Sequence, residues 1–188
     1  MSKLFYVIGA SGAGKDTLMN YARTKINGEK PVVFAHRYIT RLPDAGGENH
    51  VYLTVEEFKL RSEAGFFSLF WESHGKYYGV GTEINNWLNT GHNVVVNGSR
   101  QYLPRAQQLY PDMLVILIEA SPDTIAKRLA GRGRESAEEI EKRIKRTEEI
   151  DCDLSNCIRI QNDDTVESAG DRLVNIITLA QHLETTEK

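Results

Sequence analysis

The chain has 188 residues, of which 40% are hydrophobic and 26% are charged, a balance typical of a globular domain with its own apolar core. Its formal net charge of −3 excludes the overall positive field that favours binding to nucleic acid or to an anionic membrane. No apolar run approaches the about 20 residues that a membrane-spanning helix needs. We expect no targeting segment and a cytoplasmic location.

Cysteine and histidine give no sign of a metal centre built by the protein alone. The chain has two cysteines and five histidines, and no two histidines have the helical i, i+4 spacing. A disulfide framework and a zinc site are therefore not expected. Any metal ion that the protein uses should arrive with its substrate.

Strands and helices alternate along most of the chain. In chain order we expect a strand at 3–8, a helix at 15–26, a strand at 31–35, a helix at 54–64 that opens with a capping box, strands at 66–71 and 76–80, a helix at 82–90, strands at 94–96 and 113–118, helices at 122–130 and 136–151, a strand at 158–160 and a helix from 166 to 183. This alternation is typical of an α/β domain with a parallel sheet. The denser strand signals between residues 50 and 80 predict a small inserted lobe.

A glycine-rich segment follows the first strand and precedes the first helix. It matches the pattern GxxxxGK and consists of Gly9, Ala10, Ser11, Gly12, Ala13, Gly14 and Lys15. Glycines in such a loop let backbone N–H groups surround a polyphosphate, the lysine adds positive charge, and the helix N-terminus adds its dipole. The alternative is a glycine-rich turn that precedes a lysine by chance, but the flanking strand and helix favour a phosphate-binding loop.

The residue after the lysine departs from the usual pattern. This position normally carries a serine or threonine whose hydroxyl contacts Mg²⁺, and here it is Asp16, with Thr17 next. A carboxylate is a harder and more charged oxygen ligand that can bind the same ion, although it also brings negative charge towards the phosphates. Asp16 could instead only cap the helix, and the two roles are compatible. We predict that Asp16 is a magnesium ligand, directly or through water.

Arginines are concentrated late in the chain, at Arg128, Arg132, Arg134, Arg143 and Arg146. Planar guanidinium groups bind a phosphoryl group in transfer, and they must come from a segment that closes, because water would otherwise compete. Gly131 and Gly133 would let this segment move. The alternative is a solvated helix face paired with nearby glutamates, and it stays open for Arg146. For Arg132 and Arg143 we predict a catalytic role.

The order of these motifs resembles that of the guanylate kinases over nearly the whole chain. After the strand–GxxxxGK–helix unit come RYITR at 37–41, GKYYG at 75–79, RLAGRG at 128–133 and NDD at 162–164. A narrower resemblance is to the ribose 1,5-bisphosphate phosphokinases of phosphonate catabolism, the PhnN proteins. It rests on the loop ending GKD and on the segments at 36–41, 48–50, 77–81, 96–100 and 132–135. The combination of GKD at 14–16 with VNGSR at 96–100 is the most specific part of this resemblance.

The resemblance implies a P-loop NTPase fold with a parallel sheet flanked by helices, in a single guanylate-kinase-like domain over 1–188. Residues 36–81 would form a small substrate-binding lobe and residues 131–146 an arginine-rich lid. The implied reaction passes the γ-phosphoryl of ATP to the 1-phosphate of ribose 1,5-bisphosphate and gives 5-phospho-α-D-ribose 1-diphosphate, with Mg²⁺ as cofactor. Arg128 and Asn162 would lie on the ATP side, Asn162 at the adenine, although composition alone would make Asn162 a turn residue.

The same resemblance argues against guanine as the acceptor. Leu69 and Val80 stand where guanylate kinases use a carboxylate and a hydroxyl to hold the guanine edge. Polar groups of guanine left without partners would cost about 1–3 kcal/mol each. Ser99 replaces an aspartate of that family, and a phosphate-binding arginine is missing near residues 43–44, for which Arg100 could substitute.

A sugar bisphosphate needs binding groups for two anionic ends and for hydroxyls. The predicted substrate-binding residues are Arg37, Arg41, Arg100 and Tyr78 for the phosphates, and Glu48, Asn49, Asn97 and Ser99 for the ribose hydroxyls. His36 and His50 are weaker candidates, because a lone histidine is more often packed or at the surface. We expect Phe70, Trp71 and Tyr77 in the core.

The implied acceptor is an ionised phosphate oxygen, so no general base is needed. Lys15, the arginines and Mg²⁺ would act by positioning and by neutralising charge. Two alternatives remain, a nucleoside-monophosphate kinase of altered base preference and a non-catalytic guanylate-kinase-like binding module, and the intact Lys15 and arginine segment count against the second. The oligomeric state is left open, a homodimer included, and neither nucleic acid nor a membrane is expected as a partner.

Overall fold

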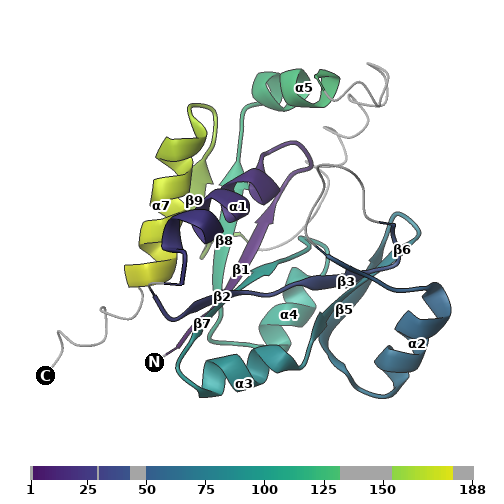
Figure 1. The fold of residues 1–188 in the computed structure, drawn as a ribbon. Coiled ribbons are helices and arrows are strands. Elements are labelled where there is room, and N and C mark those ends of the chain that lie inside the picture. The colour runs from purple at the N-terminus through teal and green to yellow at the C-terminus, as the bar shows by residue number, and fades with distance from the viewer. Residues whose placement is uncertain (1, 29, 43–49, 132–153, 180–188) are drawn as a thin grey trace, which may run out of the picture.

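The core of the molecule is a 5-stranded parallel sheet with the order β2-β7-β1-β8-β9 (Figure 1). A computed structural model describes residues 2–28, 30–42, 50–131 and 154–179. The strands are β1 (Leu4–Gly9), β2 (Val32–Phe34), β7 (Asn93–Asn97), β8 (Leu114–Glu119) and β9 (Ile158–Gln161). The predicted α/β class with a parallel sheet is therefore confirmed.

Helices cover both faces of this sheet. They are α1 (Lys15–Ile26), α3 (Glu83–Asn89), α4 (Leu103–Leu109) and α7 (Val166–Leu179). A further helix, α5 (Pro122–Ala130), lies beyond the carboxyl ends of the strands (Figure 1) and packs on Ala10 and Ala120. α1 and α7 lie together on one face, and α3 and α4 pack on the other (Figure 1). Alternate residues of β1 serve the two layers, since Tyr6 and Ile8 pack with α3 and α4, while Phe5 and Val7 pack with α1 and α7. A strand buried on both faces is apolar without interruption, as the sequence of β1 is.

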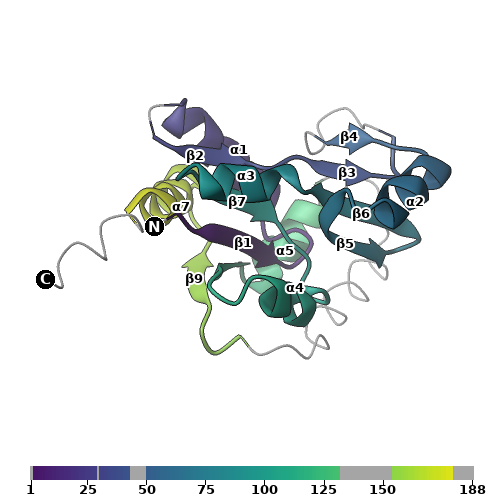
Figure 2. The same cartoon turned by 90° about the horizontal axis from the view of Figure 1, so that it is seen from below.

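A second, 4-stranded sheet forms the predicted lobe, with the order β4-β3-β6-β5. Its elements are β3 (Arg37–Ile39), β4 (Val51–Tyr52), β5 (Phe67–Ser73) and β6 (Lys76–Gly81), with α2 (Val55–Glu63) packed on them. Figure 2 shows this lobe on the side of the core away from α7. His74 and Gly75, which both have positive φ, form the tight turn expected between β5 and β6.

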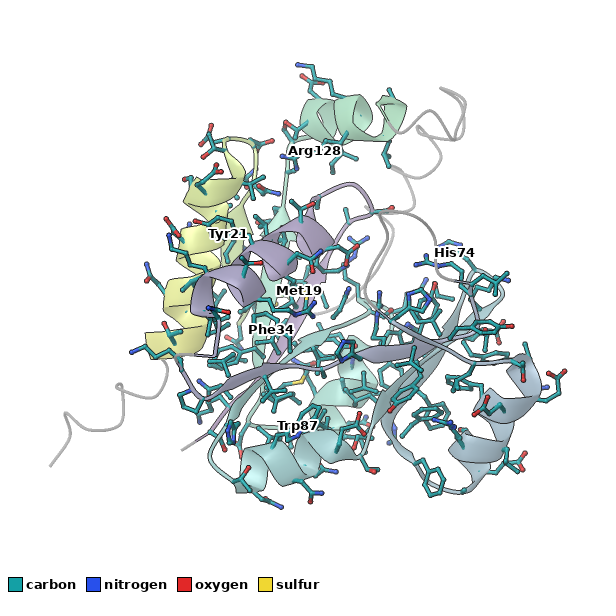
Figure 3. The ribbon with its side chains drawn as sticks, in the orientation of Figure 1. Met19, Tyr21, Phe34, His74, Trp87 and Arg128 are labelled. Atoms are coloured by element: carbon teal, nitrogen blue, oxygen red, sulfur yellow. The ribbon has the colours of Figure 1, made fainter. Side chains whose placement is uncertain are left out.

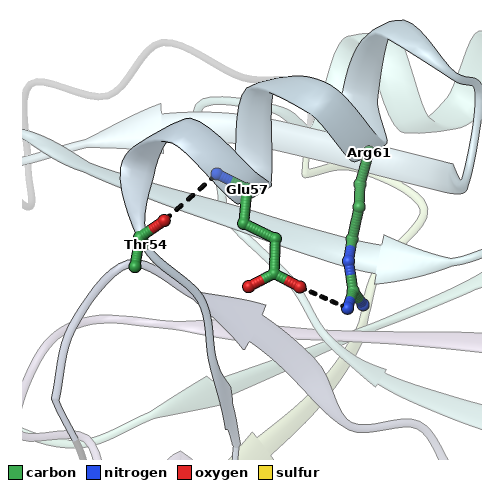
Figure 4. A network of polar contacts seen from close by, with 3 residues as sticks. All are labelled: Thr54, Glu57 and Arg61. Atoms are coloured by element: carbon green, nitrogen blue, oxygen red, sulfur yellow. Dashed lines mark hydrogen bonds and ion pairs between the residues drawn. The ribbon is translucent and has the colours of Figure 1, made fainter.

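The start of α2 confirms one half of the capping box predicted at 54–57, the N-cap bond. The Thr54 hydroxyl accepts a hydrogen bond from the Glu57 N–H at 3.1 Å (Figure 4). The Glu57 carboxylate accepts one from Arg61, one turn further on, in place of the return bond to the Thr54 backbone that a complete capping box has. Phe58 then packs on Phe67, with ring centroids 4.6 Å apart.

Three elements differ from the sequence-based prediction, which lacks β3, β4 and α4. β4 is exposed at both of its residues, and α4 buries only Leu103 and Ala106, so neither has the apolar periodicity that marks an element. The helix expected at 136–151 and the end of the last helix after Leu179 lie outside the described residues. Within the described part of the chain, no helix has the length and apolar character to cross a membrane.

Candidate active site

The glycine-rich loop lies where β1 ends and α1 begins, as predicted. Gly12 and Gly14 have φ values of 90° and 89°, a left-handed conformation that glycine adopts without strain. The Ala13 N–H donates to the Ala10 carbonyl at 3.1 Å and closes the turn. Gly14 is the N-cap of α1 and offers no capping side chain. The positive end of α1 therefore faces the loop in the way that suits an anionic ligand.

Side chains from α5 and from the end of β9 hold the back of this loop. The Ala13 carbonyl accepts hydrogen bonds from Asn162 Nδ2 at 2.7 Å and from Arg128 at 3.3 Å. Arg128 extends from α5 towards the loop (Figure 3), and Asn162 is 2% exposed. A Cβ atom at Gly14 would collide with Asn162. Both residues thus contact the loop itself, and their contact with ATP stays a prediction.

Lys15 and Asp16 open α1, and Asn97 meets them from the neighbouring strand. The Lys15 Nζ atom lies 3.8 Å from Asp16 Oδ1, and the same oxygen accepts a hydrogen bond from Asn97 Nδ2 at 2.6 Å. The Asp16 side chain is 52% exposed, whereas Asn97 is buried at the end of β7, opposite Val7 of β1. The parallel pairing of β1 with β7 thus joins Asn97, predicted to bind ribose, to the predicted magnesium ligand.

A tyrosine that the sequence analysis leaves without a role fixes the turn after β7. The Tyr6 hydroxyl donates to the Ser99 carbonyl at 3.1 Å and accepts from the Ser99 N–H at 3.0 Å. Burial raises the pKa of Tyr6, so the phenol keeps its proton. A Cβ atom at Gly98 would collide with the Tyr6 ring. The only signal in the sequence is a phenol hydroxyl within an apolar strand, which needs a partner once it is buried.

Arg37 and Tyr78, both predicted to bind substrate phosphate, lie together in the lobe. The Arg37 guanidinium stands 5.1 Å from the centroid of the Tyr78 ring and 6.0 Å from that of Trp71. Trp71 and Tyr78 are cross-strand partners whose rings are nearly parallel, 5.6 Å apart, and Tyr102 stacks on Trp71 at 5.5 Å. An arginine held over aromatic rings is a cation–π arrangement that keeps its charge in place.

The remaining predicted residues fall into different surroundings. The Arg41 carbonyl accepts a hydrogen bond from His50 Nε2 at 2.8 Å. Ser99 and Arg100 follow the carboxyl end of β7, separated from Asn97 by Gly98. Glu48, Asn49, Arg132, Arg134, Arg143 and Arg146 lie outside the described residues.

Of the three aromatic residues expected in the core, two pack there and one does not. Trp71 is buried, and Tyr77 packs on Phe58 at 5.4 Å, as expected. The prediction for Phe70 is wrong, because this side chain is 46% exposed. Phe70 lies between two inward-facing residues of β5 and therefore points to the opposite face of the strand.

The two positions that decide against guanine are apolar and closed. Leu69 of β5 and Val80 of β6 are cross-strand partners, and both are 0% exposed. They belong to the same apolar cluster as Trp71, Ile84 and Leu103, where the lobe meets the core. Neither side chain carries a polar atom, so this part of the lobe cannot pair with the edge of a base.

A family model described as guanylate kinase matches residues 1–180. The chain belongs to the guanylate kinase family. A relative from Thiobacillus denitrificans named ribose 1,5-bisphosphate phosphokinase PhnN is 50% identical over 176 residues, covering 94% of this chain and 93% of the relative. A relative of the same name from Desulfomicrobium baculatum is 49% identical over 186 residues, covering 99% and 97%. Within the guanylate kinase family, the chain therefore groups with the PhnN proteins.

A solved structure supports the fold of this guanylate kinase family member. The crystal structure of guanylate kinase from Anaplasma phagocytophilum matches with a TM-score of 0.70 and covers 98% of this chain and 87% of that one. The sequences are only 19% identical, so the match concerns the fold alone. The predicted guanylate-kinase-like fold is confirmed.

Proposed function

We propose that this guanylate kinase family member is a ribose 1,5-bisphosphate phosphokinase. An oxygen of the 1-phosphate forms a bond to the γ-phosphorus of ATP, the bond from that phosphorus to the β–γ bridging oxygen breaks, and the products are 5-phospho-α-D-ribose 1-diphosphate and ADP. The relatives that carry this name support the proposal, because they are 50% and 49% identical over nearly the whole chain. The family resemblance implies phosphonate catabolism as its setting, and we propose the cytoplasm as its location.

The buried pair Leu69 and Val80 is the observation that favours a sugar over a purine as the acceptor. The family resemblance puts the guanine-binding carboxylate and hydroxyl at these positions, and both are fully buried apolar residues here. A guanine placed against them would lose hydrogen bonds worth about 1–3 kcal/mol each, and a site that lacks such partners discriminates strongly. A sugar bisphosphate has no aromatic base, so the absence of a carboxylate and a hydroxyl at these positions costs it no hydrogen bond.

The described residues supply groups for phosphate at both ends of the transfer. Lys15 and the first turn of α1 bring positive charge to the nucleotide, and Arg37 with Tyr78 brings it to the lobe. Asp16 is half exposed at the loop and offers the oxygens that Mg²⁺ prefers, so it fits the role of holding that ion. When bound, Mg²⁺ would neutralise charge on the β- and γ-phosphates of ATP.

No proton has to be removed from the acceptor, because a phosphate oxygen is already ionised at neutral pH. The protein therefore acts by holding donor and acceptor in line and by countering their negative charge. The Lys15 side chain is only 15% exposed and stays close to the loop. Its ammonium group is therefore suited to countering the negative charge of phosphates bound there. Arg132 and Arg143 are proposed to close on the transferred phosphoryl group.

An acceptor panel tests the proposal. Purified protein is incubated with ATP and Mg²⁺ and with ribose 1,5-bisphosphate, GMP, AMP or gluconate in turn, and ³¹P NMR identifies the product. We expect a diphosphate signal distinct from that of ADP only with ribose 1,5-bisphosphate, and no product from the Lys15→Ala variant. Comparable rates with GMP would refute the proposal and support a nucleoside-monophosphate kinase, while binding of ATP without any transfer would support the non-catalytic module.

A further inference from the structure

The Asp16–Asn97 pair suggests an exchange of roles between the loop and the neighbouring strand. P-loop NTPases usually hold Mg²⁺ with a neutral hydroxyl on the loop and with a carboxylate at the end of an adjacent strand. In this chain the carboxylate, Asp16, follows the loop lysine, and the end of the adjacent strand β7 carries the neutral amide of Asn97. One negative charge is present in either arrangement, but its position has moved from the strand to the loop.

The contact between the two side chains is short and one-directional. Asn97 Nδ2 donates to Asp16 Oδ1 at 2.6 Å, and hydrogen bonds to an ionised acceptor are shorter and stronger than those between neutral groups. The opposite orientation of the amide would set two oxygen acceptors against each other, so the carboxylate determines which way Asn97 points. Asn97 is 4% exposed and lies in the rigid parallel pair of β7 with β1, whereas the Asp16 side chain is 52% exposed. The buried residue is thus fitted to hold the exposed one.

We propose that Asn97 is a positioning residue that orients the Asp16 carboxylate towards the metal ion of the bound nucleotide. The proposal rests on the ATP site of the proposed function and assigns Asn97 to the metal ligand in place of the ribose contact predicted from the sequence. The bond from Asn97 restricts the rotamers of the Asp16 side chain, and Lys15, 3.8 Å from the same oxygen, would compete with a metal ion for it. The Asn97 amide therefore keeps Asp16 directed to one place before the nucleotide binds.

One variant with two readouts separates positioning of the metal ligand from contact with the sugar. In Asn97→Ala we expect the Mg²⁺ concentration for half-maximal rate to rise by about tenfold, the usual effect of losing a group that orients a metal ligand. The KM for ribose 1,5-bisphosphate should stay within about twofold, since the variant removes no sugar contact under this proposal. A rise in that KM with an unchanged Mg²⁺ requirement would overturn the proposal and assign Asn97 to the ribose.

A charge-exchange cycle gives a second, independent result. Asp16→Thr removes the only carboxylate of the pair and should raise the Mg²⁺ requirement by about tenfold or more. The double variant Asp16→Thr with Asn97→Asp restores the usual arrangement of hydroxyl on the loop and carboxylate on the strand, and should recover most of that loss. If the double variant requires as much Mg²⁺ as Asp16→Thr alone, the two positions do not share one role and the proposal is wrong.

Nucleotide binding tests the same pair without turnover. Calorimetry with ADP, in Mg²⁺ and then in EDTA, measures how much the metal ion tightens binding, and Asn97→Ala should reduce this ratio by about tenfold. A ratio equal to that of the unaltered protein would overturn the proposal. Because this readout needs no acceptor, it holds even if ribose 1,5-bisphosphate proves not to be the substrate.

Asn93→Ala is the matched control for these measurements. Asn93 is a buried asparagine at the opposite end of β7. Its amide donates a hydrogen bond to the Ile177 carbonyl at 2.8 Å and accepts one from the Lys3 N–H at 2.9 Å. This variant should lower thermal stability and leave the Mg²⁺ ratio unchanged, because its contacts lie far from the loop. An equal fall of the ratio in both variants would mean that general loosening of β7 explains the effect, which would overturn the proposal.

Discussion

Tyr6→Phe removes one oxygen atom from the core and leaves the ring in place. That oxygen makes both hydrogen bonds to the Ser99 backbone, at 3.0 and 3.1 Å, and Tyr6 is 0% exposed. Each such bond contributes about 1 kcal/mol, so the free energy of unfolding should fall by about 2 kcal/mol, or about 3 kcal/mol if both Ser99 groups stay dry. No cavity term is added, because only the hydroxyl is lost.

Urea denaturation followed by circular dichroism measures this change. With a denaturant slope of about 2 kcal/mol/M, the midpoint should move down by about 1 M and the slope should not change. Tyr21→Phe is the matched control: its hydroxyl donates to Asp171 at 2.7 Å, but the contact is exposed, so the loss should stay within about 0.5 kcal/mol. A loss below about 0.5 kcal/mol in Tyr6→Phe would refute the claim that Tyr6 fixes the turn after β7.

Three further predictions address the loop and the buried phenol. Lys15→Ala should abolish phosphoryl transfer and leave the circular dichroism melt unchanged, and near-normal turnover would contradict the loop assignment. Gly14→Ala should weaken ADP binding in calorimetry by at least about tenfold, because a left-handed conformation costs a side chain about 1–2 kcal/mol and its Cβ meets Asn162. Gly91→Ala, with positive φ in open space, should not weaken it. Above about pH 10 the unfolded chain releases a proton that native Tyr6 keeps, so stability should fall by up to about 1.4 kcal/mol per pH unit more than in Tyr6→Phe, and equal slopes in urea titrations would contradict this.

The sequence was sufficient for those parts of the fold that local chemistry determines. β1, β7 and β8 are buried on both faces, so each contains a continuous apolar run that can be recognised without its neighbours. The turn at His74 and Gly75 and the cap at Thr54 depend on residues a few positions apart. β4 has no such signal, because both of its residues are exposed and its pairing with β3 comes from the tertiary fold.

The candidate site likewise has a part that local sequence predicts and a part that depends on the tertiary fold. The GxxxxGK loop could be found from the sequence because strand, loop and helix are contiguous. The bond from Asn97 to Asp16 could not, since it spans 81 positions and depends on β7 being the neighbour of β1. The same holds for Asn162, whose bond to the Ala13 carbonyl spans 149 positions and requires β9 to end beside the loop.

The carboxyl ends of β1 and β7 connect the two halves of the proposed reaction. β1 leads into the phosphate loop, and β7 leads into the turn at Ser99 and Arg100, which we predict to hold the acceptor. Asn97 bonds the first of these segments, and Tyr6 of β1 bonds the second. The register of this strand pair, with Val7 opposite Asn97, would therefore set where donor and acceptor stand relative to each other in the proposed reaction. Because a buried parallel pair yields little to local motion, closure over the phosphates would have to adjust to this spacing. A change in the register of the two strands, unlike the loss of the Asn97 side chain alone, should therefore affect nucleotide and sugar binding together.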